Sequence, residues 1–283
     1  MINNIFQYLY GAFTTVPVKF TARQNYAYEV IDIAISRGSI GGIDITIGGE
    51  KVAFLAGQDG IDAVTCLQLG QAGGKSIFNY LRSKGFDVPR IIIGEGETMA
   101  LASSDNGSTT YEITMIEHYG DALPKNTDKG GSMSGFKLFS PYGTITKSIV
   151  AQTTEILKIV SDINPPGYPL FPFSGAVLPK QQFNFLGLVC SKLSGCGADI
   201  VFDGVRIWKM NKSILAPDEA FVRPGIFKAV NYATGNELTV FEKPIVFGVN
   251  ETMQVEVSVA NNHATNPENA VIGVIPIMQV VPV

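Results

Sequence analysis

The sequence predicts an all-β protein built from two tandem β-sandwich domains of about eight strands each. Three observations support this prediction. The chain repeats itself at a nearly constant offset, apolar and polar residues alternate over short segments, and turn residues recur at roughly the 8–12-residue spacing of a sandwich. The 283 residues are enough for two domains that each bury a core.

The internal repeat consists of three separated blocks that occur in the same order in both halves, at an offset of 154 or 155 residues. The matched residues of the first copy are Tyr28, Val30, Ile31, Ile33, Asp44, Ile45, Ile47, Gly49, Gly94, Glu97, Thr98 and Met99. Those of the second copy are Phe183, Phe185, Leu186, Leu188, Asp199, Ile200, Phe202, Gly204, Gly248, Glu251, Thr252 and Met253. Two copies of one domain explain this order better than coincidence does.

Strand signals follow one another through the first copy. Ile43–Ile47 alternates apolar and polar residues and ends at Gly48-Gly49, which predicts a hairpin turn. Thr98–Ser103 is followed by a polar loop and then by Tyr111–Tyr119, and we interpret these two segments as a strand pair.

The second copy shows the same succession. Ala198–Phe202 leads into Asp203-Gly204, a dipeptide that favours a type I′ turn, and Val205–Trp208 follows. Thr252–Ala260, a loop and Ala270–Val281 then predict a second strand pair.

Three segments have apolar residues nearer the helical period, namely Asn4–Tyr10, Ser76–Lys84 and Ile145–Ile163. The stretch from Asp121 to Gly143 is rich in Gly, Ser, Lys and Asp, which is typical of a linker. The domains expected from these signals are an N-terminal arm (1–14), a first sandwich (15–120), a connector with a helix at 145–163 (121–171) and a second sandwich (172–283).

Composition and charge narrow the functional classes. Hydrophobic residues make up 46% of the chain and charged residues only 16%, against about 25% in a typical soluble domain, so we expect much of the surface to lie in contacts. The formal net charge is −4 without a basic run, which argues against direct nucleic-acid binding. The three cysteines, an odd number, and the lack of a secretory signal or a long apolar span predict folding in a reducing cytoplasm.

Two similar eight-stranded sandwiches, opened by the segments ARQNYAYEVIDIAI and LPKQQFNFLGLVCS, resemble the double jelly-roll major capsid proteins of tailless, membrane-containing icosahedral phages. Corticoviruses, tectiviruses and finnlakeviruses are the groups with which the chain is compared. The resemblance covers about residues 15–283 and rests on the domain pattern and on a strand followed by a Gly-Gly or Asp-Gly turn.

The resemblance implies a structural role without a catalytic residue, a cofactor or a metal ion. It implies two upright jelly rolls per subunit, homotrimers with a pseudo-sixfold outline, and a virion shell tiled from those trimers over an internal membrane. Penton and minor capsid proteins are the further partners that it implies, with assembly in the host cytoplasm.

The N-terminal segment MINNIFQYLYGAF is apolar and carries no charged side chain. As an arm it would contact the internal membrane or a neighbouring subunit, although an interfacial helix normally has a basic face and this segment has none. The other interpretation is an edge strand or short helix that covers its own core. The residues proposed for the contact are Ile2, Ile5, Phe6, Tyr8, Leu9, Tyr10 and Phe13.

Two other functional classes remain open on the sequence. A tandem β-sandwich that binds carbohydrate or a receptor, as in a virion spike, is one, and Trp208 beside a turn could stack on a sugar or pack in a core or subunit contact. The other is a nucleotide-dependent enzyme that uses Gly74-Lys75-Ser76. Only three residues separate Gly70 from Gly74, whereas a phosphate-binding loop has four at that place.

Candidate metal or nucleophile residues are scattered. His118 and His263 lack a zinc-ligand spacing, and Cys190 and Cys196 are interpreted as strand thiols. Four carboxylates stand near glycines without a complete calcium-loop pattern, namely Asp59, Asp62, Asp121 and Asp128.

Overall fold

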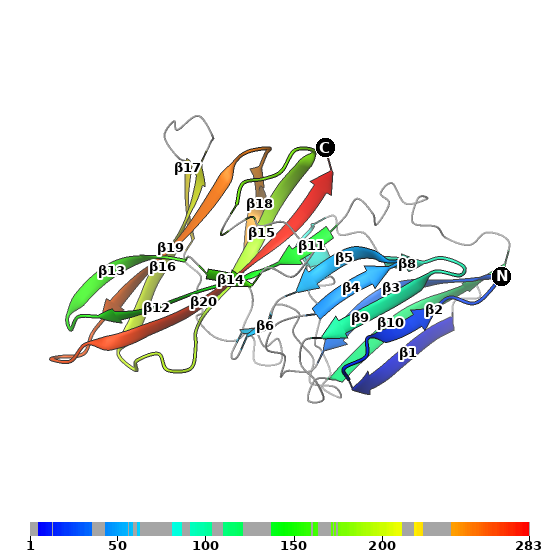
Figure 1. Cartoon of the computed structure of the whole chain (residues 1–283), viewed down its shortest axis with the longest axis horizontal. Helices are drawn as coiled ribbons and strands as arrows, with labels where there is room; N and C mark the ends of the chain where they lie inside the picture. Colours follow the sequence, from blue (N-terminus) through cyan, green and yellow to red (C-terminus); the bar gives the residue numbers. More distant parts are fainter. Residues whose placement is uncertain are drawn as a thin grey trace. The chain divides into compact units, whose positions relative to one another are not determined.

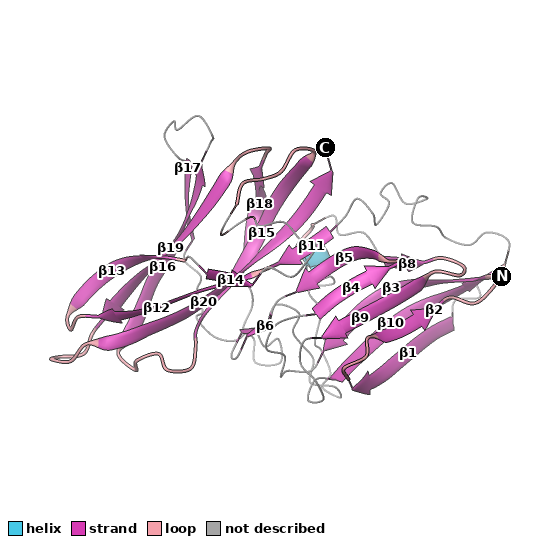
Figure 2. Cartoon of the chain, in the orientation of Figure 1, coloured by secondary structure: helices cyan, strands magenta, loops and turns pink. Residues whose placement is uncertain are grey.

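The computed structural model describes residues 5–12, 14–35, 43–55, 57–58, 61–62, 81–86, 91–103, 110–120, 137–159, 161–163, 171, 173, 175–210, 218–222 and 239–282. Strands dominate these residues, and the helical part of them is limited to residues 81–83 (Figure 2). The all-β prediction is therefore confirmed. The chain divides into two compact units, with the main break between Phe139 and Ser140.

Eight strands of the first unit form two antiparallel sheets (Figure 1). They are β1 (Ile5–Ala12), β2 (Val18–Thr21), β3 (Tyr26–Ile35), β4 (Ile43–Ile47), β5 (Glu50–Leu55), β8 (Ile91–Ile93), β9 (Thr98–Ser103) and β10 (Thr110–Tyr119). Strand β11 (Lys137–Ser140) lies beside β5, and β6 (Gly57–Gln58) pairs with β7 (Ile61–Asp62).

The strand order identifies the fold of this unit. One sheet has the order β1-β10-β3-β8 and the other β2-β9-β4-β5. The first of the eight strands therefore pairs with the last, the second with the seventh, the third with the sixth, and the fourth with the fifth. This nested pairing is a long antiparallel hairpin rolled into a sandwich, which is a jelly roll.

The second unit contains nine strands. They are β12 (Tyr142–Ile149), β13 (Thr153–Lys158), β14 (Ser161–Ile163), β15 (Gln181–Lys192), β16 (Ile200–Met210), β17 (Asp218–Val222), β18 (Thr239–Phe247), β19 (Thr252–Asn261) and β20 (Glu268–Pro282). Their orders are β12-β20-β15-β18, with β14 outside β12, and β13-β19-β16-β17. With β14 left aside, this is the order of the first unit, strand for strand.

The duplication predicted from the sequence is thus present in the topology. Tyr28 lies on β3 and its match Phe183 lies on β15, and both strands occupy the third position of their roll. We call the two units the first and the second roll.

Alternation of side chains builds the core of each roll. On β4 the isoleucines 43, 45 and 47 are buried while Asp44 and Thr46 are half-buried. On β19 Met253, Val255 and Val257 point into the core in the same way. Burying one such side chain contributes about 1.5–3 kcal/mol relative to leaving it in water.

The two predicted hairpin turns have different outcomes. Gly48 and Gly49 have φ of 57° and 88° and join β4 to β5, as predicted. The prediction of a turn at Asp203-Gly204 was wrong, because β16 runs through both residues. Its pairing with β19 shifts register between Phe202 and Gly204. The Asp-Gly pair supplies a β-bulge there instead of a chain reversal.

The helix expected over 145–163 is also wrong, since these residues form most of β12 and all of β13 and β14. The segment is rich in Thr, Ile and Val, whose branched side chains favour strands. A turn interrupts it at Gln152, which has φ of 58° although it is not a glycine. The second roll consequently begins at Tyr142, inside the expected connector.

Two further predictions need correction. The segments Thr98–Ser103 and Tyr111–Tyr119 are strands, but β9 and β10 lie in different sheets, as do β19 and β20. Residues 5–10 are neither helix nor free arm, because Ile5–Ala12 forms β1 and pairs with β10 along its whole length. The edge-strand interpretation of the N-terminal segment is the one that the structure supports.

Candidate functional site

Two turns are clasped together at one end of the first roll. Ala22 N donates a hydrogen bond to the carbonyl of Glu97 (3.0 Å), and Gly96 N donates to the carbonyl of Ala22 (3.1 Å). The Glu97 carboxylate folds back and accepts a hydrogen bond from Gly94 N (2.7 Å). Gly96 has φ of 73°, a conformation that suits glycine at the third position of a tight turn.

The second roll repeats this clasp atom for atom. Val177 N donates to the carbonyl of Glu251 (2.9 Å), and Asn250 N donates to the carbonyl of Val177 (2.8 Å). The Glu251 carboxylate accepts a hydrogen bond from Gly248 N (2.7 Å). Asn250 has φ of 65°, and asparagine tolerates this conformation better than most residues. The conserved spacing between glycine and glutamate in the sequence repeat therefore encodes the clasp.

Replacing Glu97 or Glu251 with alanine is expected to lower the free energy of unfolding by about 1–3 kcal/mol, because a charge-assisted hydrogen bond is lost and a backbone N–H loses its acceptor. Urea unfolding measures the loss. Glu97→Gln and Glu251→Gln keep a side-chain oxygen and serve as matched controls with smaller losses. Equal losses in the alanine and glutamine variants would contradict a role for the hydrogen bond.

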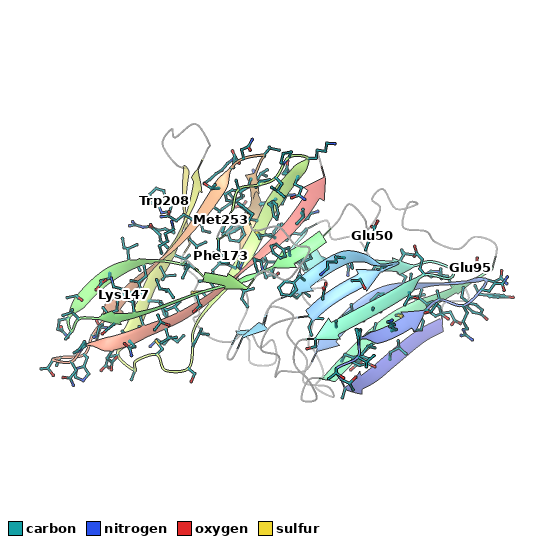
Figure 3. All side chains as sticks on the ribbon, viewed as in Figure 1. Glu50, Glu95, Lys147, Phe173, Trp208 and Met253 are labelled. Atoms are coloured by element: carbon teal, nitrogen blue, oxygen red, sulfur yellow. The ribbon has the colours of Figure 1, made fainter. Side chains whose placement is uncertain are left out.

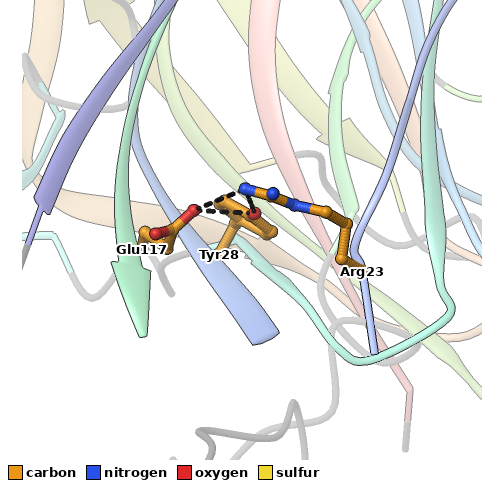
Figure 4. A network of polar contacts seen from close by, with 3 residues as sticks. All are labelled: Arg23, Tyr28 and Glu117. Atoms are coloured by element: carbon orange, nitrogen blue, oxygen red, sulfur yellow. Dashed lines mark hydrogen bonds and ion pairs between the residues drawn. The ribbon is translucent and has the colours of Figure 1, made fainter. Parts of the chain in front are cut away.

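A polar network lies beside the clasp of the first roll (Figure 4). The Tyr28 hydroxyl donates to Glu117 Oε2 (2.8 Å), across the β3–β10 pair. Arg23 Nη2 lies 3.4 Å from the Tyr28 hydroxyl and 3.3 Å from Glu117 Oε2, and donates to both. The three side chains converge at one end of the sandwich.

Burial governs the electrostatics of this network. Tyr28 is 1% exposed and the Glu117 side chain 9%, whereas the Arg23 side chain is 66% exposed. Burial raises the pKa of the Tyr28 phenol, and its hydrogen bond to Glu117 acts in the same direction. The pKa of Arg23 is raised mainly by its hydrogen bond to Tyr28. Tyr28 is therefore a neutral hydrogen-bond donor that holds a buried carboxylate.

Aromatic rings extend the network to the surface. The Arg23 guanidinium lies 4.8 Å from the centroid of the Tyr26 ring, a cation–π distance. Tyr26 contacts Tyr119, with ring centroids 4.9 Å apart, and Tyr119 is 61% exposed. This Arg23–Tyr26–Tyr119 surface combines residue types that are enriched at binding hot spots.

A second buried carboxylate lies on the neighbouring positions of the same strands. Glu29 is 3% exposed, and its Oε2 lies 3.1 Å from His118 Nε2. Two acidic side chains of one strand pair are thus held by a tyrosine and arginine in one case and by a histidine in the other.

The second roll has apolar residues at the matching positions. Leu178 matches Arg23, Phe183 matches Tyr28, and Val280 lies opposite Phe183 where the first roll has Glu117. Phe171 packs on Phe183 with ring centroids 4.7 Å apart. The two rolls share their backbone clasp but differ in the chemistry beside it.

At the end of the second roll opposite to its clasp, a buried asparagine joins two turns. Asn261 is 0% exposed, and its Nδ2 donates to the carbonyls of Ile149 (2.9 Å) and Asn266 (3.1 Å). Its Oδ1 accepts a hydrogen bond from His263 N (2.9 Å). This one side chain connects the β12–β13 turn to the β19–β20 turn.

Further hydrogen bonds stabilise the two turns at this end of the second roll. His263 Nδ1 accepts from the backbone N–H groups of Thr265 (3.2 Å) and Asn266 (2.9 Å). Gln152 Nε2 donates to the carbonyls of Asn262 (2.8 Å) and His263 (2.9 Å). The His263 side chain therefore serves as a hydrogen-bond acceptor that stabilises a turn.

Trp208 is only partly buried, so it is not a full core residue, and its stacking on a sugar or packing in a subunit contact stays a prediction. It is half-buried on β16, and its Nε1 donates to Glu256 Oε2 (2.9 Å) on the neighbouring strand (Figure 3). Gln254 also donates to the Glu256 carboxylate (2.6 Å). The carboxylate fixes the indole against the sheet.

The other candidate residues do not assemble into a reactive centre in the described ranges. No group of three or more metal-ligating side chains occurs among the described residues. Cys190 is buried and Cys196 half-buried, and neither forms a disulfide bond in the described part of the chain. Asp62 lies on β7. Cys66, the Gly70–Ser76 segment, Asp59, Asp121 and Asp128 lie outside the described residues.

Some of the N-terminal residues proposed to contact a membrane or a neighbouring subunit lie on a described strand, and others lie outside the described residues. Ile5, Phe6, Tyr8, Leu9 and Tyr10 lie on β1, and Ile2 and Phe13 fall outside the described part. In that part, no helix is long and apolar enough to span a bilayer. Their contact with a membrane or a neighbouring subunit stays a prediction.

Sequence reasoning did not single out Arg23, Tyr26, Tyr119 or Asn261 as site residues. Tyr28 was part of the repeat, but its match with Phe183 indicated only a shared core position. The one local sign of the polar network was that the first copy has a tyrosine, Tyr28, where the second copy has a phenylalanine, Phe183.

No known family model matches the chain, and none of the curated proteins compared with it matches either. Two solved viral structures are similar over most of the chain. A triple jelly-roll structure concerned with turret assembly in an archaeal virus shares 10% identity, with 97% of this chain and 59% of that chain covered and a TM-score of 0.23. A structure from Sulfolobus turreted icosahedral virus shares 12% identity, with 96% and 60% covered and a TM-score of 0.23.

An IolB-like protein from Salmonella typhimurium is similar at the same level, with 7% identity, 96% of this chain and 82% of that chain covered and a TM-score of 0.20. The chain spans about three fifths of the length of the two viral chains. At such TM-scores, the jelly-roll assignment rests on the strand order of the chain itself.

Proposed function

We propose that this protein is a major capsid protein that forms pseudo-hexagonal trimers, and that these trimers tile an icosahedral virion shell. The observation that carries the proposal is the presence of two jelly rolls with the same strand order in one chain. Three such chains around an axis supply six similar rolls, so a threefold ring acquires a nearly sixfold outline that can tile a surface.

The low charge of the chain supports a role in contacts between subunits. Only 16% of the residues are charged, and the role needs no reactive group or cofactor. The expected partners are other copies of the chain, penton and minor capsid proteins and an internal viral membrane, with no direct contact to nucleic acid. The expected location is the virion, after assembly in the host cytoplasm.

The proposal is tested by the mass and shape of the purified protein. Sedimentation and electron microscopy are expected to show trimers, with three times the 30.4 kDa of the chain, and closed or sheet-like assemblies of those trimers. A protein that stays monomeric at all concentrations tested would contradict the proposal.

A tandem binding module is the second candidate, and one observation favours it. The Arg23–Tyr26–Tyr119 surface of the first roll has no counterpart among the described residues of the second, because Leu178 stands at the position of Arg23 there. Such a surface suits stacking on a sugar or a protein partner. A monomeric chain that binds a glycan through Tyr119 would favour this candidate.

A further inference from the structure

Strand β1 is an open edge of the first roll. It pairs with β10 over all eight of its residues without a register shift, and among the described strands it has no other neighbour (Figure 1). In an antiparallel ladder, alternate residues direct their N–H and C=O groups to opposite sides. Half of the backbone groups of β1 are therefore directed away from β10.

The sequence of β1 contains none of the usual protections of an edge. Natural edge strands are short, carry charged residues or proline, contain a bulge or are covered. The segment IFQYLYGA has no charge and no proline, and its ladder has no bulge.

The other edge strands described in the two rolls are protected. β8 is three residues long. The remaining edges each contain a charged residue, namely Lys19 on β2, Glu155 on β13, Asp162 on β14, Asp218 on β17 and Lys243 on β18. β1 is the exception among them.

The matching strand of the second roll gives the closest comparison. β12 occupies the place of β1, and β14 covers its outer edge from Tyr142 to Thr144. Further along, β12 carries Lys147, which pairs with Glu155. One part of this edge is thus covered and the other part charged, whereas β1 carries no charge and no other described strand covers it.

We propose that β1 pairs antiparallel with β1 of a second copy across a twofold axis, so that the two sheets join into one. This inference rests on the proposed function, in which trimers need a contact beyond the one that closes the ring. A twofold contact uses the same patch on both copies, so any charge near its centre would face a like charge. A strand without charges meets this condition.

A lipid membrane is a less suitable partner for the edge of β1 than a second copy of the strand. Unpaired backbone groups are costly in hydrocarbon, and open sheet edges are not found there. Binding to the headgroup region is usually assisted by lysine or arginine, and Ile5–Ala12 has neither. A second strand satisfies the outward N–H and C=O groups directly.

The test uses the full chain and two lysine variants. Tyr8 on β1 and Thr114 on β10 are direct partners in the ladder, so the two variants add the same charge at the same level of the sheet, one on the edge strand and one on its neighbour. Tyr8→Lys is expected to weaken the association of trimers about tenfold or more, because like charges meet at the contact. Thr114→Lys, one strand away from the edge, is expected to change it by less than about threefold.

Amide hydrogen exchange of the wild-type chain supplies a second measurement that needs no variant. Alternate amides of Ile5–Ala12 are expected to exchange rapidly in dissociated trimers and slowly in assemblies. Equal association of Tyr8→Lys and wild type, unchanged exchange on assembly, or protection by phosphatidylglycerol–phosphatidylethanolamine vesicles instead of by assembly would each overturn the inference. A wild-type chain that never leaves the monomer would refute the proposed function itself, and is distinguished from these outcomes by its mass.

Discussion

Replacing Phe183 with alanine is expected to lower the free energy of unfolding of the second roll by about 3–5 kcal/mol, the usual cost of removing a buried phenylalanine ring. Phe183 is 0% exposed, and Phe171 packs on it at 4.7 Å between ring centroids. Phe171 in turn lies 5.2 Å from Phe247. The alanine leaves a cavity within this cluster of three rings.

Urea unfolding followed by circular dichroism measures this effect, and the transition of the second roll is the one expected to move. Phe241→Ala is the matched control, since Phe241 lies on the edge strand β18 and is only half-buried. We expect the control to cost less than about half as much. If the Phe183→Ala loss were under about 1.5 kcal/mol, the aromatic cluster would not be the centre of this core.

The Asn261→Ala variant is expected to lose about 2–4 kcal/mol, because several buried hydrogen bonds disappear at once. The side chain is 0% exposed and bonds to Ile149, Asn266 and His263. Without it, the carbonyl of Ile149 loses a donor and the N–H of His263 loses an acceptor. Faster amide exchange in the β19–β20 turn is the local sign of the same change.

Asn266→Ala serves as the control for this prediction. The Asn266 side chain is exposed and accepts only a long hydrogen bond from Thr265, at 3.4 Å. Its backbone contacts to His263 and Asn261 survive the substitution. Equal losses in the two variants would show that the turn is stabilised by its backbone alone.

The sequence was informative where a local pattern determines the structure. The spacing between Gly94 and Glu97 and its copy at Gly248 and Glu251 predicted two related domains, and each pair forms a turn clasp. Gly48-Gly49 predicted a turn because two adjacent positive φ angles suit glycine. These signals depend on residues within four positions of one another.

Other features depend on residues that are distant in the sequence. Tyr28 and Glu117 form a hydrogen bond although 89 residues separate them, so no local pattern indicates the network. The turn at Gln152 has no glycine, and the apolar residues around it imitated a helical period. Strand pairing across the sandwich overrode that period, as tertiary contacts often do.

The nested strand pairing also sets an order for folding during synthesis. The innermost pair of the first roll joins Ile47 to Glu50, three residues apart, whereas the outermost joins Ile5 to Glu117, 112 residues apart. In the second roll, β12 meets β20 only after residue 268 has left the ribosome. Closing such long loops is slow because chain entropy opposes it. Each roll should therefore form from its innermost hairpin outward, and its first strand must wait for its last.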